Sequence, residues 1–326
     1  MTSATPPSPP PGAPSWQTAA TTLYLVDPAG GRYPITTFPP PGDGPSARLV
    51  DWSGDGTRAL FSTVGKDGTV LTEVDLRSGT KTSFIVDGTQ PSIRYTRPDG
   101  KALLLYRASK TRSLERVDLA GNHQLTYPIG QDFEGYLSTP DGTQLVVGTA
   151  SGVALMGNDG VAGKALPIAG QKDCTPLRWW DADSTVALAR CDGTASRLWL
   201  VPIDGGTPTA LTAPTNGKGP DYGDLNAWQL PAGTFVQAAG ACGVVYLAKL
   251  NGDGTTAPVS VPAVKSGSVV VVGVHDGDIN LQARAGCGSG QSLIDYNPAA
   301  GTSTVLLGPT VNGGGVISAL PYPGQR

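Results

Sequence analysis

Three features of the 326-residue sequence predict an all-β fold, a β-propeller with seven four-stranded blades and six as the alternative count. The first is an excess of turn-forming residues, with 45 glycines and 29 prolines. The second is a charged content of only 15%, where about 25% is usual, so few side chains are available to cover exposed helices. The third is a motif that recurs about every 44 residues, a period typical of propeller blades.

The recurring motif is a tight turn between two apolar runs, clearest at Asp55-Gly56, Asp99-Gly100 and Asp141-Gly142. Asp-Gly is a strong hairpin signal, because glycine tolerates positive φ and aspartate bonds to its own turn backbone. Weaker copies place turns at residues 184, 233 and 277. The first two strands of each blade are therefore predicted to be six such hairpins.

A second turn follows each copy, so every period holds four strands. These turns, with one more near the start of the chain, contain Gly30, Gly79, Gly121, Gly160, Gly205, Gly254 and Gly301. Four strands in a fixed period are typical of a β-propeller, whereas a two-layer sandwich needs no such period. The sandwich is therefore the weaker prediction.

The two ends of the chain determine the predicted blade count. A lone strand is expected over residues 315–320, and residues 15–20 can supply another short one. We expect the C-terminal strand to join the N-terminal strands and close the ring, which would remove an open sheet edge. The predicted boundaries are a Pro-rich disordered linker over 1–14, one propeller domain over 15–322 and a tail over 323–326.

Three turn motifs resemble a known repeat: Trp52-Ser53-Gly54-Asp55-Gly56, Arg97-Pro98-Asp99-Gly100 and Thr139-Pro140-Asp141-Gly142. They are similar to the Trp-Ser-Pro-Asp-Gly consensus of the WD40-like (PD40) propeller repeat of TolB and its relatives. The resemblance implies a propeller over residues 21–322 in an extracytoplasmic protein that binds other proteins. The same repeat also occurs beside catalytic domains in some peptidases.

The four cysteines, Cys174, Cys191, Cys242 and Cys287, all fall on one face of the expected propeller. None forms a Cys-x-x-Cys motif, so a zinc site is not indicated. We predict the disulfides Cys174–Cys191 within a blade and Cys242–Cys287 between neighbouring blades, although three pairings are open. Disulfides would indicate an oxidising compartment, and four buried thiols in a cytosolic protein are the alternative.

Charge and hydropathy indicate which binding partners and which cellular location are expected for the protein. The formal net charge is −3, which argues against a nucleic-acid partner because such partners need a basic surface. No apolar run approaches the roughly 20 residues that span a bilayer. The proline-rich start suggests that a signal or membrane anchor precedes residue 1, so we expect a monomeric extracytoplasmic protein, either secreted or anchored to the cell envelope.

No motif for covalent or cofactor chemistry is present. The two histidines, His123 and His275, both lie by expected turns and are interpreted as surface residues. No Gly-x-Ser-x-Gly elbow or complete calcium loop occurs, so no catalytic residue, cofactor or metal site is predicted. A pair of carboxylates that meets only in space stays open.

The loops that lead into the first strand of each blade are acidic. They contain Asp43, Asp87, Asp132, Glu134, Asp173, Asp221 and Asp224. These loops would surround one mouth of the central channel and could bind a cationic protein, peptide or metal ion. The alternative is a set of solvated turns in which aspartate serves as a good turn residue.

These features favour a non-enzymatic extracytoplasmic propeller that acts as a protein-binding, ligand-binding or sensor module. The aromatic residues Trp52, Tyr95, Trp179, Trp180 and Trp228 are expected to fill the space between blades. The alternative function is a carbohydrate- or peptide-directed lyase or hydrolase with carboxylates in the central channel.

Overall fold

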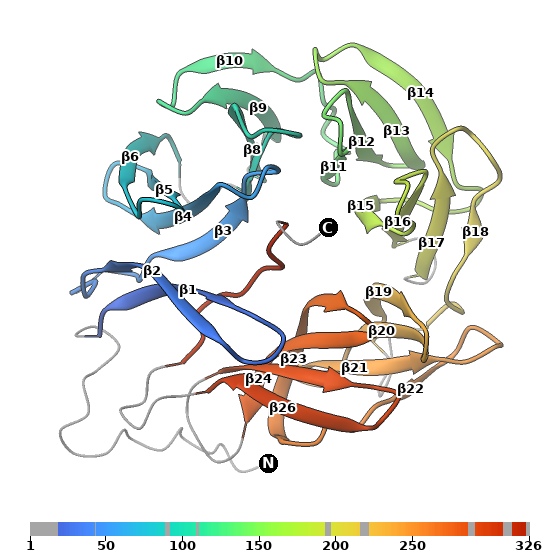
Figure 1. Cartoon of the computed structure of the whole chain (residues 1–326). Helices are drawn as coiled ribbons and strands as arrows, with labels where there is room; N and C mark the ends of the chain where they lie inside the picture. The colour runs from blue at the N-terminus through green and yellow to red at the C-terminus, as the bar shows by residue number, and fades with distance from the viewer. Residues whose placement is uncertain are drawn as a thin grey trace. The chain divides into compact units, whose positions relative to one another are not determined.

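The computed structural model describes residues 19–42, 44–88, 92–108, 111–192, 197–215, 222–285, 291–308 and 315–323. Apart from one 3-10 turn, η1 (Ala241–Gly243), all the regular elements in these ranges are strands. They form six four-stranded antiparallel sheets and one two-stranded sheet (Figure 1). The fold is an all-β β-propeller with six four-stranded blades, the lower of the two predicted counts.

Every four-stranded sheet consists of four consecutive strands, each paired with its neighbours in sequence. The predicted turns that join these strands adopt a left-handed backbone, which favours glycine. The first-hairpin turns have φ of 68° at Gly56, 67° at Gly100, 72° at Gly142, 56° at Ser184, 122° at Gly233 and 89° at Gly277. The seven second-hairpin glycines have φ between 67° and 99°. The turn inventory predicted from the sequence is therefore confirmed at each position.

The chain forms two compact units, the first made of Met1–Asp51, Thr57–Thr89 and Ser260–Arg326. It holds the two-stranded sheet and two of the four-stranded sheets, β3–β6 and β23–β26. Its strands are β1 (Thr21–Val26), β2 (Arg32–Phe38), β3 (Arg48–Trp52), β4 (Arg58–Val64), β5 (Thr69–Asp75), β6 (Lys81–Val86), β23 (Val264–His275), β24 (Asp278–Ala285), β25 (Ser292–Asn297) and β26 (Thr302–Leu307).

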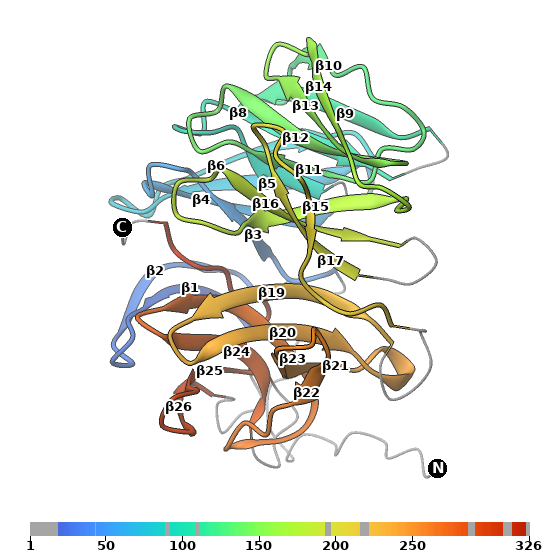
Figure 2. The ribbon, with the colours of Figure 1, turned by 90° about the vertical axis from the view of Figure 1, so that its right-hand side faces the viewer.

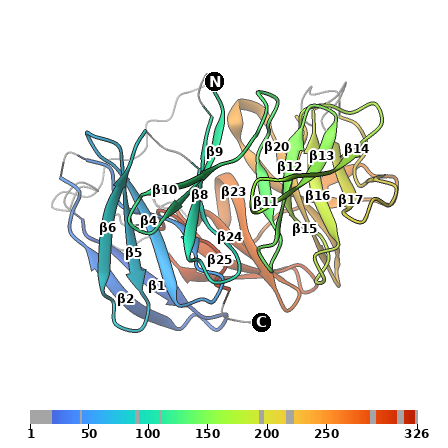
Figure 3. The same cartoon turned by 90° about the horizontal axis from the view of Figure 1, so that it is seen from above.

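The second unit, Trp52–Gly56 and Gln90–Val259, holds the other four sheets. Figure 3 shows β12, β13 and β14 side by side, and Figure 2 shows β19 to β22. Its strands are β7 (Ser92–Tyr95), β8 (Ala102–Arg107), β9 (Ser113–Asp118), β10 (His123–Thr126), β11 (Tyr136–Ser138), β12 (Gln144–Thr149), β13 (Gly152–Gly157), β14 (Ala162–Pro167), β15 (Cys174–Trp179), β16 (Val186–Cys191), β17 (Arg197–Pro202), β18 (Thr209–Ala210), β19 (Asp224–Leu230), β20 (Gly233–Ala239), β21 (Val245–Leu250) and β22 (Thr256–Pro258).

The second strands of several sheets contribute continuous runs of buried residues to the core. Residues 102–105 in β8, 145–147 in β12 and 187–189 in β16 are all buried. A strand covered on both faces is continuously apolar rather than alternating. Burial of these apolar runs from water is the main force that holds neighbouring sheets of the second unit together.

The aromatic residues of the first strands also belong to the core. Trp52, Tyr95 and Trp228 are buried. Trp179 and Trp180 are partly buried and pack against two apolar clusters of the second unit. Their role in filling space between sheets is as predicted.

The β1–β2 hairpin lies between two sheets of the first unit (Figure 1). The Arg32 guanidinium donates two hydrogen bonds to the carbonyl of Leu306 in β26, at 2.9 and 2.6 Å. On the other side, the ring centroids of Phe38 and Phe61 are 4.6 Å apart. The hairpin therefore contacts both β23–β26 and β3–β6, in the place where the sequence predicts a seventh four-stranded blade.

The C-terminal segment differs from the prediction, because residues 315–320 form no strand and pair with neither β1 nor β2. Instead, the Val316 amide donates to the carbonyl of Gln291 at 2.8 Å. The Leu49 amide at the start of β3 donates to Ser318 Oγ at 3.0 Å. Prolines at 321 and 323 lack the amide hydrogen that a ladder requires, and the segment joins two sheets through isolated hydrogen bonds.

Parts of both termini lie outside the described residues. The predicted linker over 1–14 and Asp43 lie outside the described residues, and the single-domain boundary at 15–322 stays a prediction. Within the described ranges, no helix has the length and apolar character needed to cross a membrane.

Candidate functional site

A disulfide joins Cys174, the first residue of β15, to Cys191, the last residue of β16. The two residues are directly opposite in the antiparallel ladder, with their Cα atoms 4.0 Å apart. Directly opposed positions place the two Cβ atoms close enough for a bridge. The predicted pairing is confirmed, although both cysteines are strand residues rather than loop residues, and both are buried.

The second predicted disulfide is not tested. Cys242 is an exposed residue of η1 with φ of 57°, and it bonds to no other described cysteine. Its expected partner, Cys287, lies outside the described residues. The pairing of Cys242 with Cys287 therefore stays a prediction.

Five of the seven residues of the predicted acidic mouth lie within the described residues, and the mouth itself stays a prediction. Asp43 and Asp221 lie outside the described residues, and Asp87 belongs to the first unit. In the second unit, Asp173 has φ of 50° just before β15, and Asp224 is a buried first residue of β19. Asp132 and Glu134 share the loop that leads into β11.

A neighbouring arginine changes the charge of that loop. Arg112 Nη1 lies 2.6 Å from Glu134 Oε1 and also donates to the carbonyl of Phe133. The hydrogen bond to Glu134 and the charge of Asp132 raise the pKa of Arg112. Asp132 Oδ2 accepts a hydrogen bond from the Ala150 amide at 3.3 Å. The prediction from the sequence named only the acidic residues of these loops and did not include Arg112 as a counter-ion. A cationic partner stays a prediction.

The two histidines have different surroundings. His123 is exposed, and its Nε2 lies 2.8 Å from Thr126 Oγ1 on the same strand. It is a surface residue, as predicted. His275, the last residue of β23, is only partly exposed and belongs to a cluster of acidic and amide side chains.

This acid–base cluster consists of His275, Asp278, Asn280 and Asp295. Asp295 Oδ1 lies 3.2 Å from His275 Nε2 and accepts a hydrogen bond from Asn280 Nδ2 at 3.0 Å. The ladders place Asp278 opposite His275 and Asn280 opposite Asp295. Three adjacent strands of one sheet therefore bring the four side chains together at the β23–β24 turn.

Two buried atoms of the cluster have no hydrogen-bond partner among the described residues. They are Nδ1 of His275 and Oδ1 of Asp278. Buried polar atoms are normally paired, so each such atom calls for a specific explanation. Bound water is one partner that could satisfy these buried atoms.

The cluster also perturbs its central carboxyl group. Burial raises the pKa of Asp295, and the charge of Asp278 raises that pKa further, while His275 opposes the change. Loss of hydration disfavours the charged carboxylate, as does a second carboxylate nearby. A carboxylic acid that keeps its proton more readily is suited to donate that proton in a reaction.

The sequence-based analysis missed Asp278 and Asp295. One signal is visible in retrospect: Asp278, Asn280 and Gln282 occupy alternate positions of an otherwise apolar strand. Alternation in a strand places all three side chains on one face. The opposite face, with Ile279 and Leu281, is fully buried, so the polar face is not needed for the main core.

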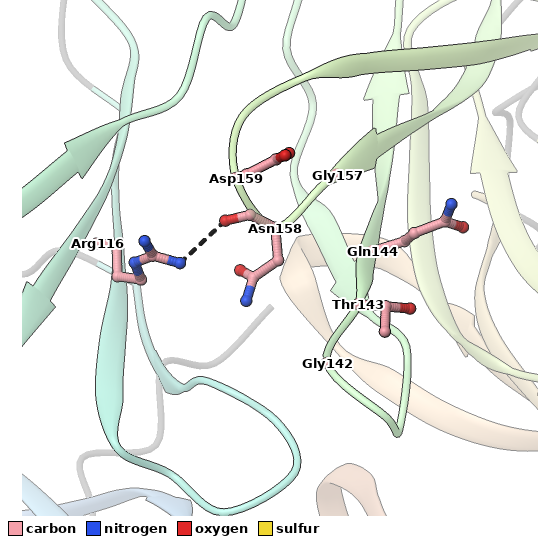
Figure 4. Close-up of a pocket in the computed structure, with 7 residues that line it drawn as sticks. All are labelled: Arg116, Gly142, Thr143, Gln144, Gly157, Asn158 and Asp159. Atoms are coloured by element: carbon pink, nitrogen blue, oxygen red, sulfur yellow. Dashed lines mark hydrogen bonds between the residues drawn. The ribbon is translucent and has the colours of Figure 1, made fainter.

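A separate polar depression of about 510 Å³ lies in the second unit (Figure 4). It is lined by Arg116, Gly142, Thr143, Gln144, Gly157, Asn158 and Asp159. Arg116 Nη1 donates to the carbonyl of Asn158 at 2.9 Å, and Tyr127 Oη donates to Oδ1 of the same asparagine at 2.8 Å. These bonds join two neighbouring sheets, so the role of Arg116 is structural.

No group of three or more His, Cys, Asp or Glu side chains within the described ranges could hold a metal ion. The acid–base cluster is the candidate functional site, because a histidine beside carboxyl groups is suited to proton transfer.

No family profile and no curated protein matches the chain. Solved structures share its fold. An oligogalacturonate lyase from Vibrio parahaemolyticus is 13% identical, with a TM-score of 0.57 over 89% of this chain and 85% of the other. An oligogalacturonate lyase in complex with manganese is 16% identical, with the same TM-score and coverage. The β-propeller domain of the Trilobed protease from Pyrococcus furiosus is 12% identical, with a TM-score of 0.55 over 88% of this chain and 93% of the other.

These likenesses show a propeller fold and correct one prediction. The sequence-based reading of a non-enzymatic module is wrong, because the similar propellers include a lyase and a protease domain. That prediction depended on the absence of catalytic motifs from the sequence. Acid–base residues of a propeller come from separate strands, so they leave no local motif. The resemblance to TolB-type proteins extends to the propeller and is not supported by a family match.

Proposed function

We propose that the protein is a carbohydrate-directed lyase or hydrolase whose reacting groups are His275, Asp278 and Asp295. The observation that carries the proposal is the partly buried histidine–carboxyl contact with a second carboxyl beside it. The similar lyases act, by their names, on an oligosaccharide, which supports a carbohydrate over a peptide.

Acid–base cleavage needs one group that accepts a proton and another that donates one, and the cluster offers a different side chain for each role. When Nε2 of His275 carries hydrogen and donates to Asp295, the buried Nδ1 keeps its lone pair and can accept a proton through a bound water. The Asp278–Asp295 pair, in which ionisation of both carboxyls is disfavoured, holds the proton that is donated. Asn280 fixes Asp295 for this transfer.

In cleavage of a glycosidic bond, His275 Nδ1 takes a proton and the Asp278–Asp295 pair protonates the leaving oxygen. A lyase takes the proton from a sugar carbon, forms a carbon–carbon double bond and consumes no water. A hydrolase takes the proton from water, whose oxygen forms the new bond to the sugar. Both reactions balance with these side chains and, for the hydrolase, one water molecule.

The test is an activity screen on polygalacturonate, a neutral glucan and a proline-containing peptide. Ultraviolet absorbance of an unsaturated sugar reports a lyase, new reducing ends without that absorbance report a hydrolase, and peptide cleavage would contradict the carbohydrate assignment. We expect Asp295→Asn and His275→Gln each to lower kcat by about 100-fold or more.

The matched control is Asp276→Asn, on the exposed turn between β23 and β24. Asp276 has φ of 46°, which asparagine tolerates, so kcat should be unchanged. Equal activity of all three variants would contradict the assignment of the cluster.

We also propose an extracytoplasmic location, which the disulfide supports because such bonds persist in oxidising compartments. Whether the protein is secreted or anchored is a finer question. Fractionation of the native host, with detection of the oxidised Cys174–Cys191 peptide by mass spectrometry, tests it. Reduced thiols at both positions in the native protein would contradict an oxidising location.

A further inference from the structure

Arg178 is a partly buried cation on β15, at a bulge between Pro176 and Arg178. Its Nη1 donates to the carbonyl of Ala227 at 3.1 Å. Its guanidinium carbon lies 5.3 Å from the centroid of the Trp228 ring. An apolar cluster that includes Leu188 and Ala227 surrounds this part of the second unit.

No carboxylate balances this charge within the described ranges. Other arginines of the described part have such partners, among them Arg58 with Glu73, Arg107 with Glu115 and Arg112 with Glu134. For Arg178, loss of hydration alone lowers the pKa to about 10. Buried charges in proteins are normally paired, because an unpaired one loses its hydration without compensation.

The side chain of Arg178 is partly exposed. Within the described part, Nη1 is the guanidinium nitrogen with a hydrogen-bond acceptor, and Nε and Nη2 have none. The planar guanidinium presents its donors as a fork that matches the oxygens of a carboxylate, sulfate or phosphate. The site therefore offers charge and donors and lacks an anion.

We propose that Arg178 binds a small oxyanion, a carboxylate, sulfate or phosphate group, at the first strand of the β15–β18 sheet. The Ala227 carbonyl and the Trp228 ring hold the guanidinium in place, so that the bound anion supplies the missing counter-charge. This site is independent of the acid–base cluster and does not rest on the proposed enzymatic function.

Titration calorimetry on the full chain tests the site with three probes, inorganic phosphate, sulfate and glucuronate, at constant ionic strength. Comparison of the three probes shows whether the site binds a phosphate, a sulfate or a carboxylate group, and glucose serves as the neutral probe. We expect at least one anion to bind, and Arg178→Met to weaken that binding by about tenfold or more. Glucose should not bind through Arg178.

The matched control is Arg197→Met, since the Arg197 guanidinium carbon lies 5.6 Å from the centroid of the Trp199 ring on strand β17 of the same sheet. This variant should bind the anion within about twofold of the wild type. If Arg178→Met fails to fold, Arg178→Lys keeps the charge, lacks the fork and should still weaken binding.

Three results would overturn the proposal. They are no binding of any anion by the wild type, undiminished binding by the Arg178 variants, and an equal loss in the Arg197 variant. Because the measurement is of binding, its outcome is separate from that of the activity screen.

Discussion

Asp295 shows how position alone changes the chemistry of a common side chain. Several turn aspartates, such as Asp75 and Asp118, accept hydrogen bonds from backbone or side-chain groups of their own turns, and these bonds lower their pKa. Asp295 lies on a strand between His275 and Asp278, where burial raises its pKa. The same residue type therefore serves as a turn former in one place and as a proton donor in another.

The raised pKa of Asp295 predicts a pH dependence of stability. A group whose pKa is higher in the folded state contributes stability below its ordinary value of 3.8. That contribution is lost as the pH rises through the raised pKa, because the folded state then has to hold a buried charge. Asp295→Asn should therefore gain stability relative to the wild type between pH 3 and pH 7.

Thermal melting of both proteins across that pH range measures the effect. Asp276→Asn is again the control, since its side chain is exposed and should follow the wild type. A difference between Asp295→Asn and the wild type that stays constant with pH would contradict the raised pKa.

The candidate site was only partly predictable from the sequence. His275 is one of two histidines in the sequence, but it was interpreted as a surface residue and not as part of a site. Asp278 and Asp295 could not be predicted, because 17 residues separate them and only the ladder of β24 with β25 brings them near each other. Their environment is decided by burial and register, which depend on contacts along the whole sheet.

At the scale of elements, the sheets of the second unit are joined by a repeated device. A basic side chain of one sheet donates to a turn carbonyl of the next, as Arg116 does to Asn158 and Lys164 does to Asp204, at 2.9 and 2.7 Å. Both acceptors lie in the second-hairpin turns. A side chain thus satisfies a turn carbonyl and aligns two neighbouring sheets at once.

Arg116 is partly buried and Lys164 is exposed, so removal of the two side chains should affect stability differently. Arg116→Met should lower the free energy of unfolding by about 1–3 kcal/mol, because it leaves the Asn158 carbonyl without its charged donor. Lys164→Met, a matched change at an exposed residue, should have an effect within about 0.5 kcal/mol. Denaturant titration of the two variants checks both values, and equal effects would contradict the role given to burial.

The Cys174–Cys191 disulfide ties two adjacent strands that the ladder already pairs. Its closed loop predicts that Cys174→Ala/Cys191→Ala lowers the free energy of unfolding by about 3 kcal/mol. Cys242→Ala is the control. It should have little effect if Cys242 is a free thiol, and should destabilise the protein if Cys242 bonds to Cys287.

Denaturant titration under non-reducing conditions, with thiol alkylation of the unfolded protein, gives both answers. Alkylation of two cysteines indicates one disulfide, and alkylation of none indicates two. An undiminished stability of the double variant would contradict the contribution of the observed bridge.

At the scale of the whole molecule, the first and the last described segments each contact the same two sheets of the first unit, β3–β6 and β23–β26. The β1–β2 hairpin contacts β26 through Arg32 and β4 through Phe38. The C-terminal segment bonds to β24 through Gln282 and Val316, and to β3 through Ser318. Neither the hairpin nor the C-terminal segment belongs to a four-stranded sheet. The contacts of both join residues that are far apart in the sequence.

Deletion of residues 315–326 should therefore lower the melting temperature by several degrees, since it removes contacts to two sheets of the first unit at once. Ser318→Ala removes only the hydrogen bond from Leu49 and should have a smaller effect. Calorimetry of both variants measures the difference. A melting curve of the truncated protein that matches the wild type would contradict a role for this segment in stability.

The sequence was enough to predict an all-β propeller, its turns and one disulfide, because these depend on local chemistry. Glycine at positive φ, aspartate in tight turns and a repeated four-strand period are all visible without a structure. Tertiary structure alone decided that six blades are four-stranded, that the first hairpin stays two-stranded and that the C-terminal segment forms no strand. It also decided which polar residues meet in the acid–base cluster and that Arg178 lies against the Trp228 ring, since burial and pairing arise from contacts between distant segments. The excess of glycine determined where the chain turns, and the packing of sheets determined what those turns bring together.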